Sequence, residues 1–219
     1  MARLPRLAVA GELHLVTQRA RPGVALFDDA ADRQAYLDAL REAARQQRIA
    51  IHAYGLLDTE ARWLVTPPTA DALGRALQSL GRRFGAAYNR RHVCSGGLWS
   101  GRYRAVAVEP ASQFLRSLRY VEDDAARASS APHHTGERSD PIVTHHAEFW
   151  RLGNTPFERE IGYRAAREQV LTDEEIAGIE TALRGGWPLG SEGFRLAIEA
   201  ATARRIEPRV PGRKKTVPE

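Results

Sequence analysis

Hydrophobic positions recur along this chain with two spacings, and the shorter spacing predicts strands. Leu13, Leu15 and Thr17 alternate with their neighbours, as in a strand with one buried face. The predicted strands lie at residues 11–18, 49–57 and 62–66 and through Val106 and Val108. The second and third are separated only by the residues around 57–59, which predicts a hairpin.

The longer spacing, of three to four residues, predicts helices. One stripe is continuous over five turns and consists of Leu73, Leu77, Leu80, Phe84 and Tyr88. An earlier helix begins after Asp28 and Asp29, which can cap it, and carries Tyr36, Leu37, Leu40 and Ala44. A later helix opens at Pro110 and includes Phe114, Leu115, Leu118 and Val121.

The order βαββαβ followed by a helix predicts an α+β fold of the ferredoxin-like type, with one antiparallel sheet and helices on one face. We expect this domain to span residues 1–128. Residues 129–144 are rich in Ala, Ser, His and Pro and predict a linker. Residues 145–205 predict a helical region, with a capping box from Thr172, an end at Gly185 and Gly186 and a cap at Ser191. A basic tail follows at 206–219.

Composition narrows the class of protein without naming a function. Of 219 residues, 43% are hydrophobic and 27% are charged, which is ordinary for a soluble globular protein. There is no apolar run of roughly 18 residues and no secretory signal, so we expect a bacterial cytoplasmic protein without a membrane partner. The single cysteine, Cys94, excludes an internal disulfide and a cysteine-built zinc site, and it lacks a recognisable histidine partner.

Positive charge is concentrated in two blocks. The net charge is +5, and 30 of the 32 basic residues are arginines. Residues 74–108 contain seven arginines and no acidic residue, and residues 203–219 form the second block. This distribution fits a polyanion partner, with nucleic acid as the first candidate. A solvated helix face with a disordered tail is the alternative.

Several segments, in order, resemble the REP-associated tyrosine transposases, which are single-tyrosine members of the HUH nuclease superfamily. The segments are RLPR at 3–6, HLVTQR at 14–19, HAY at 52–54, LVTP at 64–67, LGRR at 80–83, YNRR at 88–91, LWSGRY at 98–103, RYVE at 119–122 and GWPLGSEGF at 186–194. The resemblance implies binding of hairpin-forming DNA ends and cleavage of single-stranded DNA by a tyrosine, which leaves a 5′-phosphotyrosine and a free 3′-OH.

The family also implies a divalent ion, Mg²⁺ or Mn²⁺, that polarises the scissile phosphate. Its ligands are two histidines of a His-hydrophobic-His triplet and a polar residue one helical turn after the tyrosine. Residues i and i+2 of a strand face the same side, roughly 7 Å apart, so two imidazoles can share one ion that acts as a Lewis acid.

This chain departs from the family at both histidine positions. They are occupied by Glu60 and Arg62, whereas the nucleophile position retains Tyr120. The third ligand position, usually Asn, is Asp124, and the following proline is replaced by Ala125. We therefore expect no bound metal and impaired cleavage, with Mg²⁺ or Mn²⁺ required only if the chain is active.

The substituted positions have three interpretations. Glu60 and Asp124 could form a carboxylate-only Mg²⁺ site. Arg62 could replace the ion, pair with a carboxylate and hold a DNA phosphate through its guanidinium. In the third interpretation, neither residue has a role. On a helical wheel Arg116, Tyr120, Asp124 and Arg127 share one stripe, so two arginines would favour the phenolate of Tyr120.

The residues predicted to contact DNA are all basic. They are Arg75, Arg82, Arg83, Arg90, Arg91, Arg102, Arg116, Arg127, Arg213, Lys214 and Lys215. Trp99 and Tyr103 could stack on unpaired bases or belong to the core, and Trp63 is expected in the core. The pairs His133–His134 and His145–His146 lack the spacing of a zinc site, and His14 and His52 are expected to pack or form hydrogen bonds.

Three functions follow from these observations. The leading one is a transposase-like protein that binds single-stranded or hairpin DNA with a degenerate metal site. The second is an active single-tyrosine transposase. The third is an RNA-binding module, which ranks last because residues 104–108 carry no aromatic side chain.

Overall fold

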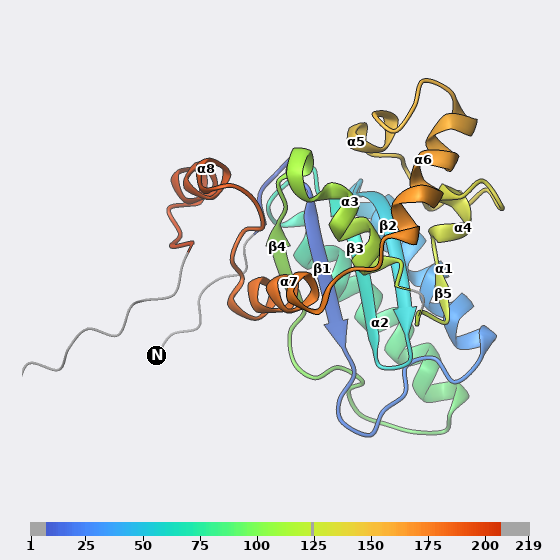
Figure 1. The fold of residues 1–219 in the computed structure, drawn as a ribbon. Coiled ribbons are helices and arrows are strands. Elements are labelled where there is room, and N and C mark those ends of the chain that lie inside the picture. Colours follow the sequence, from blue (N-terminus) through green and yellow to red (C-terminus); the bar gives the residue numbers. More distant parts are fainter. Residues whose placement is uncertain (1–7, 124, 207–219) are drawn as a thin grey trace, which may run out of the picture.

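Five strands form one antiparallel sheet in the order β4-β1-β3-β2-β5 (Figure 1). The computed structural model describes residues 8–123 and 125–206. The strands are β1 (His14–Arg19), β2 (Ala50–Leu57), β3 (Glu60–Thr66), β4 (Arg104–Ala107) and β5 (Ala128–Ser129). The longer helices are α1 (Ala30–Gln47), α2 (Ala72–Arg91), α3 (Pro110–Val121), α6 (Pro156–Glu168), α7 (Asp173–Gly185) and α8 (Glu192–Thr202). Two single-turn helices are α4 (Ala131–His134) and α5 (Ala147–Trp150). The predicted α+β class and βαββαβ order are confirmed.

The hairpin between β2 and β3 determines where the polar residues of β3 point. Leu57 pairs with Glu60, so only Asp58 and Thr59 form the turn. The strand therefore begins at Glu60, two residues earlier than the hydrophobic pattern predicts, because tight turns allow pairing up to the loop. Glu60, Arg62 and Leu64 consequently share one face of the sheet.

The other face of β3 packs against α1 and α2. The predicted stripe of α2 is buried throughout, as expected for an amphipathic helix on a sheet. At the centre of this layer Tyr36 makes an edge contact with Phe84, and Trp63 is 2% exposed, which confirms its prediction as a core residue. Trp99 packs on the same cluster, since its ring lies 6.0 Å from that of Phe84.

The Glu60 face is covered by α3 and α7 (Figure 1). Leu15, Leu64, Leu118 and Ile179 belong to one buried cluster that joins β1, β3, α3 and α7. The sheet is thus covered on both sides. Helices α1 and α2 lie on one face, as predicted, whereas α3 and α7 cover the other.

Gly55 allows α3 to lie close to the sheet. A Cβ at this position would overlap the backbone carbonyl of Val121, the last residue of α3. Because only glycine leaves this space, the C-terminal end of α3 rests directly on β2. This contact places Tyr120 over the sheet.

The segment predicted as a linker, 129–144, packs against the sheet. Ser129 pairs with Gly55 of β2, and Ser130 and His134 are buried. A bridge between Ile51 and Val143 attaches its end. The segment has the composition of a linker, but its polar side chains have buried partners, which composition cannot reveal.

The C-terminal region is helical, as predicted, and shares the core of the sheet. Thr172 forms the predicted capping box at α7, Gly186 ends that helix with a left-handed conformation, and Ser191 caps α8. Phe149 and Tyr163 belong to the same cluster as Leu15. Within residues 8–123 and 125–206, no helix has both the length and the apolar character to cross a membrane.

Candidate functional site

The structure brings Glu60, Arg62 and Tyr120 together on the face covered by α3 and α7. The guanidinium carbon of Arg62 lies 4.1 Å from the centre of the Tyr120 ring. Nη1 of Arg62 also donates to the backbone carbonyl of Tyr120 at 2.8 Å. A cation over an aromatic face is attracted by the ring quadrupole, so Arg62 both supports the ring and caps the end of α3.

The surroundings of Arg62 explain why a long side chain fits inside the protein. Its neighbours across the sheet are Thr17 and Gly55, two small residues that leave room above β3. Arg62 is only 7% exposed, and a charge at that depth requires partners. They are Asp123 at 3.1 Å and Glu60 at 3.6 Å.

A chain of alternating charges continues from Glu60 to the covering helix. Glu60 forms an ion pair with Arg19 of β1 at 3.2 Å, and Arg19 reaches Glu180 of α7 at 3.5 Å. The chain links β3, β1 and α7 across the buried face. The carboxylate of Glu60 is therefore paired with two guanidinium groups, those of Arg19 and Arg62.

Residues 60 and 62 do not fit the ligand pair of a divalent ion. An ion at the family's position would meet the guanidinium of Arg62, which has no lone pair to donate. The carboxylate of Glu60 is already neutralised by Arg62 and Arg19. Asp124, the predicted third ligand, lies outside the described residues.

Tyr120 is buried in the core rather than presented to solvent. It is 2% exposed, and its hydroxyl has no hydrogen-bond partner among the residues that the structure describes. Burial raises the pKa of Tyr120 to about 12, although the nearby charge of Arg62 acts in the opposite direction. The phenol is therefore protonated at neutral pH.

The predicted stripe of arginines beside Tyr120 is not formed. Helix α3 ends at Val121, so Arg127 lies outside it and pairs with Asp58 at 2.8 Å. Arg116 pairs with Glu175 of α7 at 3.0 Å. The wheel placed Tyr120 on an outer face because the sequence does not show that α7 covers it.

A pocket of about 160 Å³ opens beside Tyr120. Its polar wall includes Arg62, Arg119 and Arg167, and its apolar wall includes Leu171 and Ile176. The prediction from sequence missed Arg119 and Arg167. Arg119 stands next to the tyrosine in the chain and could have been suspected, whereas Arg167 is brought in by α6 without a local signal.

Glu122, next to the pocket, is the centre of a buried hydrogen-bond cluster. Its carboxylate accepts from Ser130, from the hydroxyl of Tyr163 and from Nδ1 of His134, the last at 2.7 Å. Glu122 is 1% exposed, so these partners satisfy its oxygens inside the protein. The cluster joins α3, α4 and α6 and was not predicted.

The predicted basic block of residues 74–108 begins on α2, on the opposite side of the sheet from Tyr120. Three arginines there have acidic partners: Arg75 pairs with Asp71, Arg83 with Glu42, and Arg91 with Asp29 and Asp32. Arg82, Arg90 and Arg102 are exposed and form no ion pair within the described part of the chain. Arg213, Lys214 and Lys215 lie outside the described residues.

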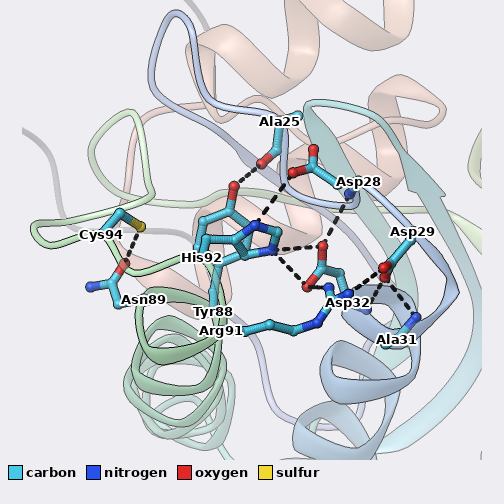
Figure 2. Close-up of polar contacts among 10 residues, drawn as sticks. All are labelled: Ala25, Asp28, Asp29, Ala31, Asp32, Tyr88, Asn89, Arg91, His92 and Cys94. Carbon is cyan, nitrogen blue, oxygen red and sulfur yellow. Dashed lines mark hydrogen bonds and ion pairs between the residues drawn. The ribbon is translucent and has the colours of Figure 1, made fainter.

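Arg91 belongs to a polar network that joins the start of α1 to the end of α2 (Figure 2). Asp32 is 1% exposed and lies 3.0 Å from Nε2 of His92 and 2.5 Å from Nη1 of Arg91. Asp28, Asp32 and His92 bring ligand atoms within 4.8 Å of one another. With the guanidinium of Arg91 paired to the same carboxylate, the group is a network of hydrogen bonds and ion pairs between two helices.

His14, His52 and Cys94 are not among the residues that line the pocket beside Tyr120. His14 bonds to the backbone of residues 9 and 12, and His52 bonds to the carbonyl of Thr144 and the hydroxyl of Thr66. These contacts agree with the prediction that both pack or form hydrogen bonds. Cys94 is exposed and contacts the side-chain oxygen of Asn89 (Figure 2).

Comparison with known proteins identifies a fold rather than a close relative. No protein-family model and no curated protein matches the chain. A solved REP-associated tyrosine transposase, bound to a REP hairpin, is 14% identical with a TM-score of 0.53, over 68% of this chain and 93% of that chain. A candidate transposase from Deinococcus radiodurans R1 is 20% identical with a TM-score of 0.38, over 58% of this chain and 100% of that chain. The first similarity establishes a shared fold.

Proposed function

We propose that this chain is a transposase-like protein that binds single-stranded or hairpin DNA and whose DNA cleavage is impaired. The partner follows from two features. The protein that shares its fold is bound to a REP hairpin, and this chain carries exposed arginines at positions 82, 90 and 102 that have no acidic partner among the described residues. Such residues bind phosphates at any sequence.

The observation that carries the proposal of impaired cleavage is the position of Arg62. Its guanidinium lies over the Tyr120 ring, where the family's resemblance implies a metal-bound imidazole. A protonated, buried phenol without a metal ion beside it is a poor nucleophile. The alternative, an active transposase, would require another position of Tyr120 and a metal ion held by other residues.

The test combines binding and cleavage on one substrate. A labelled DNA hairpin with single-stranded flanks is titrated with the full chain at about 50 and 200 mM salt, because counterion release makes phosphate-dominated affinity fall with salt. We expect tight binding that weakens at least about tenfold between these salt concentrations. With Mn²⁺ added, we expect no nicking above that of the Tyr120→Phe variant.

Each part of the proposal has its own opposing result. Salt-independent or absent binding would refute the DNA partner, and preference for an RNA hairpin of the same sequence would favour the RNA-binding alternative. Efficient Mn²⁺-dependent nicking that Tyr120→Phe abolishes would identify an active enzyme.

A further inference from the structure

The carboxylates that line the pocket beside Tyr120 already have partners. Three guanidinium groups, of Arg62, Arg119 and Arg167, face two carboxylates, of Glu122 and Asp123. Both oxygens of Glu122 are taken by Ser130, His134 and Tyr163. Asp123 is held by Arg62 and by the backbone N–H of Ala125. The pocket therefore favours an anion.

The guanidinium group of Arg119 pairs with neither of these carboxylates. It is half-buried on α3 and forms no ion pair or hydrogen bond with any residue in the described part of the chain. Arginines near a protein surface commonly pair with a carboxylate, and several others in this chain do so. An arginine without such a partner in a concave site is suited to an external anion.

Two buried donors lining the same pocket also lack partners. Nε of Arg62 and the hydroxyl of Tyr120 belong to side chains that are 7% and 2% exposed, and neither atom has a hydrogen-bond partner among the described residues. An unsatisfied buried donor is unfavourable, more so when the group is charged. The side chains that line the pocket are therefore short of acceptor oxygens.

The volume of the pocket limits the size of such an anion. Pockets for whole organic ligands measure roughly 300–1,000 Å³. This one measures about 160 Å³, which suits a phosphate group rather than a base with its sugar. A terminal phosphate carries nearly two negative charges at pH 7, whereas a phosphodiester carries one, so the arginine-rich wall favours the terminal group.

We propose that this pocket binds the terminal phosphate of a DNA strand. The inference rests on the proposed DNA-binding function and adds recognition of a phosphorylated strand end, with Arg119 as the binding residue. It requires neither a metal ion nor bond cleavage.

The test compares hairpins that differ only at their ends. Hairpins with a 5′-phosphate, a 3′-phosphate or hydroxyl ends are titrated against the full chain in phosphate-free buffer with chelator. We expect one phosphorylated hairpin to bind about tenfold more tightly than the hydroxyl hairpin, as befits charge-assisted hydrogen bonds. In Arg119→Gln that ratio should fall to near one.

Arg90→Gln is the matched control, because Arg90 likewise forms no ion pair with the described residues but is exposed and lies on α2, across the sheet. It should weaken all three hairpins alike and preserve the ratio. Equal affinities of the three hairpins for the wild-type chain would refute the pocket's role while leaving hairpin binding intact.

A second measurement does not depend on the DNA partner. Inorganic phosphate is titrated into the wild-type chain and Arg119→Gln, and the resonances of the arginine side chains are followed. Shifts that saturate in the wild type and are lost in the variant support the pocket even if no hairpin binds. Absence of saturable shifts in the wild type, together with equal hairpin affinities, overturns the inference.

Discussion

Arg62 shows how one side chain changes the chemistry that a strand can offer. A histidine at this position would present a lone pair, whereas arginine presents a fixed charge and five donors. That charge is compensated by the carboxylates of Glu60 and Asp123 and by the face of the Tyr120 ring. The strand face is thereby suited to anions rather than to cations.

The first residue-scale prediction tests whether residues 60 and 62 still occupy a ligand geometry. In the double variant Glu60→His/Arg62→His, two imidazoles would share one face of β3 beside Tyr120. We expect a Mn²⁺ binding isotherm by calorimetry where the wild type gives none. The single variant Glu60→His is the control, because Arg62 remains and its charge opposes the ion.

A folded double variant that binds no Mn²⁺ would contradict the family's ligand geometry at these positions. Slow nicking of hairpin DNA by the variant, lost with Tyr120→Phe, would extend the result to catalysis. Metal affinity is the clearer measurement, because misplacement by about 1 Å can reduce a rate 10²-fold.

The second residue-scale prediction concerns Gly55. In Gly55→Ala the added methyl group would meet the carbonyl of Val121, and overpacking of this kind costs about 1–3 kcal/mol. We expect the urea midpoint to fall accordingly. Gly85→Ala is the matched control, because a Cβ there meets nothing within 4 Å and Gly85 lies inside α2, where alanine stabilises by about 0.5–1 kcal/mol. Equal effects of the two variants would contradict the close approach of α3.

At the scale of single residues, the sequence predicts which residues belong to the site better than it predicts how deeply they are buried. The period of a strand and the family resemblance together point to Glu60, Arg62 and Tyr120, which the structure brings together. The burial of Tyr120 depends on α7, more than fifty residues later in the chain, and no local pattern encodes it.

Among the elements, those with a strong period are predictable and those held by polar contacts are not. Helix α2 follows its stripe of five apolar residues, and the sheet order follows from the βαββαβ sequence of elements. Segment 129–144 has no apolar period. Its packing depends on the hydrogen bonds of Ser130 with Tyr54 of β2 and of His134 with Glu122, which follows α3. Tyr54 is distant in the sequence, and Glu122 is buried.

The element-scale prediction concerns five buried or half-buried histidines. Burial lowers the pKa of His14, His52 and His145 to about 4 and lowers the pKa of His133 and His146 in the same direction. The unfolded chain binds these protons near pH 6.5 and the folded chain does not, so stability falls as the pH drops from 6.5 to 4. Urea midpoints at pH 7.0, 5.5 and 4.5 should decrease in that order.

His52→Gln supplies the matched variant, since an amide can replace the bonds to Thr144 and Thr66 without titrating. The variant should show a smaller decrease between pH 7.0 and 4.5 than the wild type. An unchanged decrease would assign the acid sensitivity to other groups, such as carboxylates paired with arginine, whose contribution is lost at lower pH.

Across the whole molecule, the exposed Arg82 and Arg90 of α2 lie across the sheet from the buried charges around Arg62. Arg82, Arg90 and Arg102 face solvent, and Arg62 with its partners lies beneath α3 and α7. The exposed arginines offer general phosphate contacts, whereas Arg62 lines a small pocket. Hairpin binding and end recognition are therefore separable by mutation.

The prediction at this scale concerns the basic tail, which lies outside the described residues. Removal of residues 209–219 deletes Arg209, Arg213, Lys214 and Lys215. We expect weaker binding to every DNA hairpin and a shallower dependence of affinity on salt, because basic side chains contact phosphates at any sequence. Fluorescence anisotropy with two unrelated hairpins measures both quantities. A change in preference between the hairpins, with the salt dependence unchanged, would show that the tail reads sequence.

The charge chain from Glu180 through Arg19 and Glu60 to Arg62 also restricts how this site can evolve. Changing Arg62 alone leaves Glu60 with one partner, and changing Glu60 alone leaves a buried guanidinium held mainly by Asp123. Removing one member of a buried ion pair is destabilising, because the remaining charge loses part of its compensation. Any path that replaces both residues one at a time therefore passes through a less stable intermediate. The charge chain couples the two positions, so that substitutions at Glu60 and Arg62 are tolerated more readily together than singly.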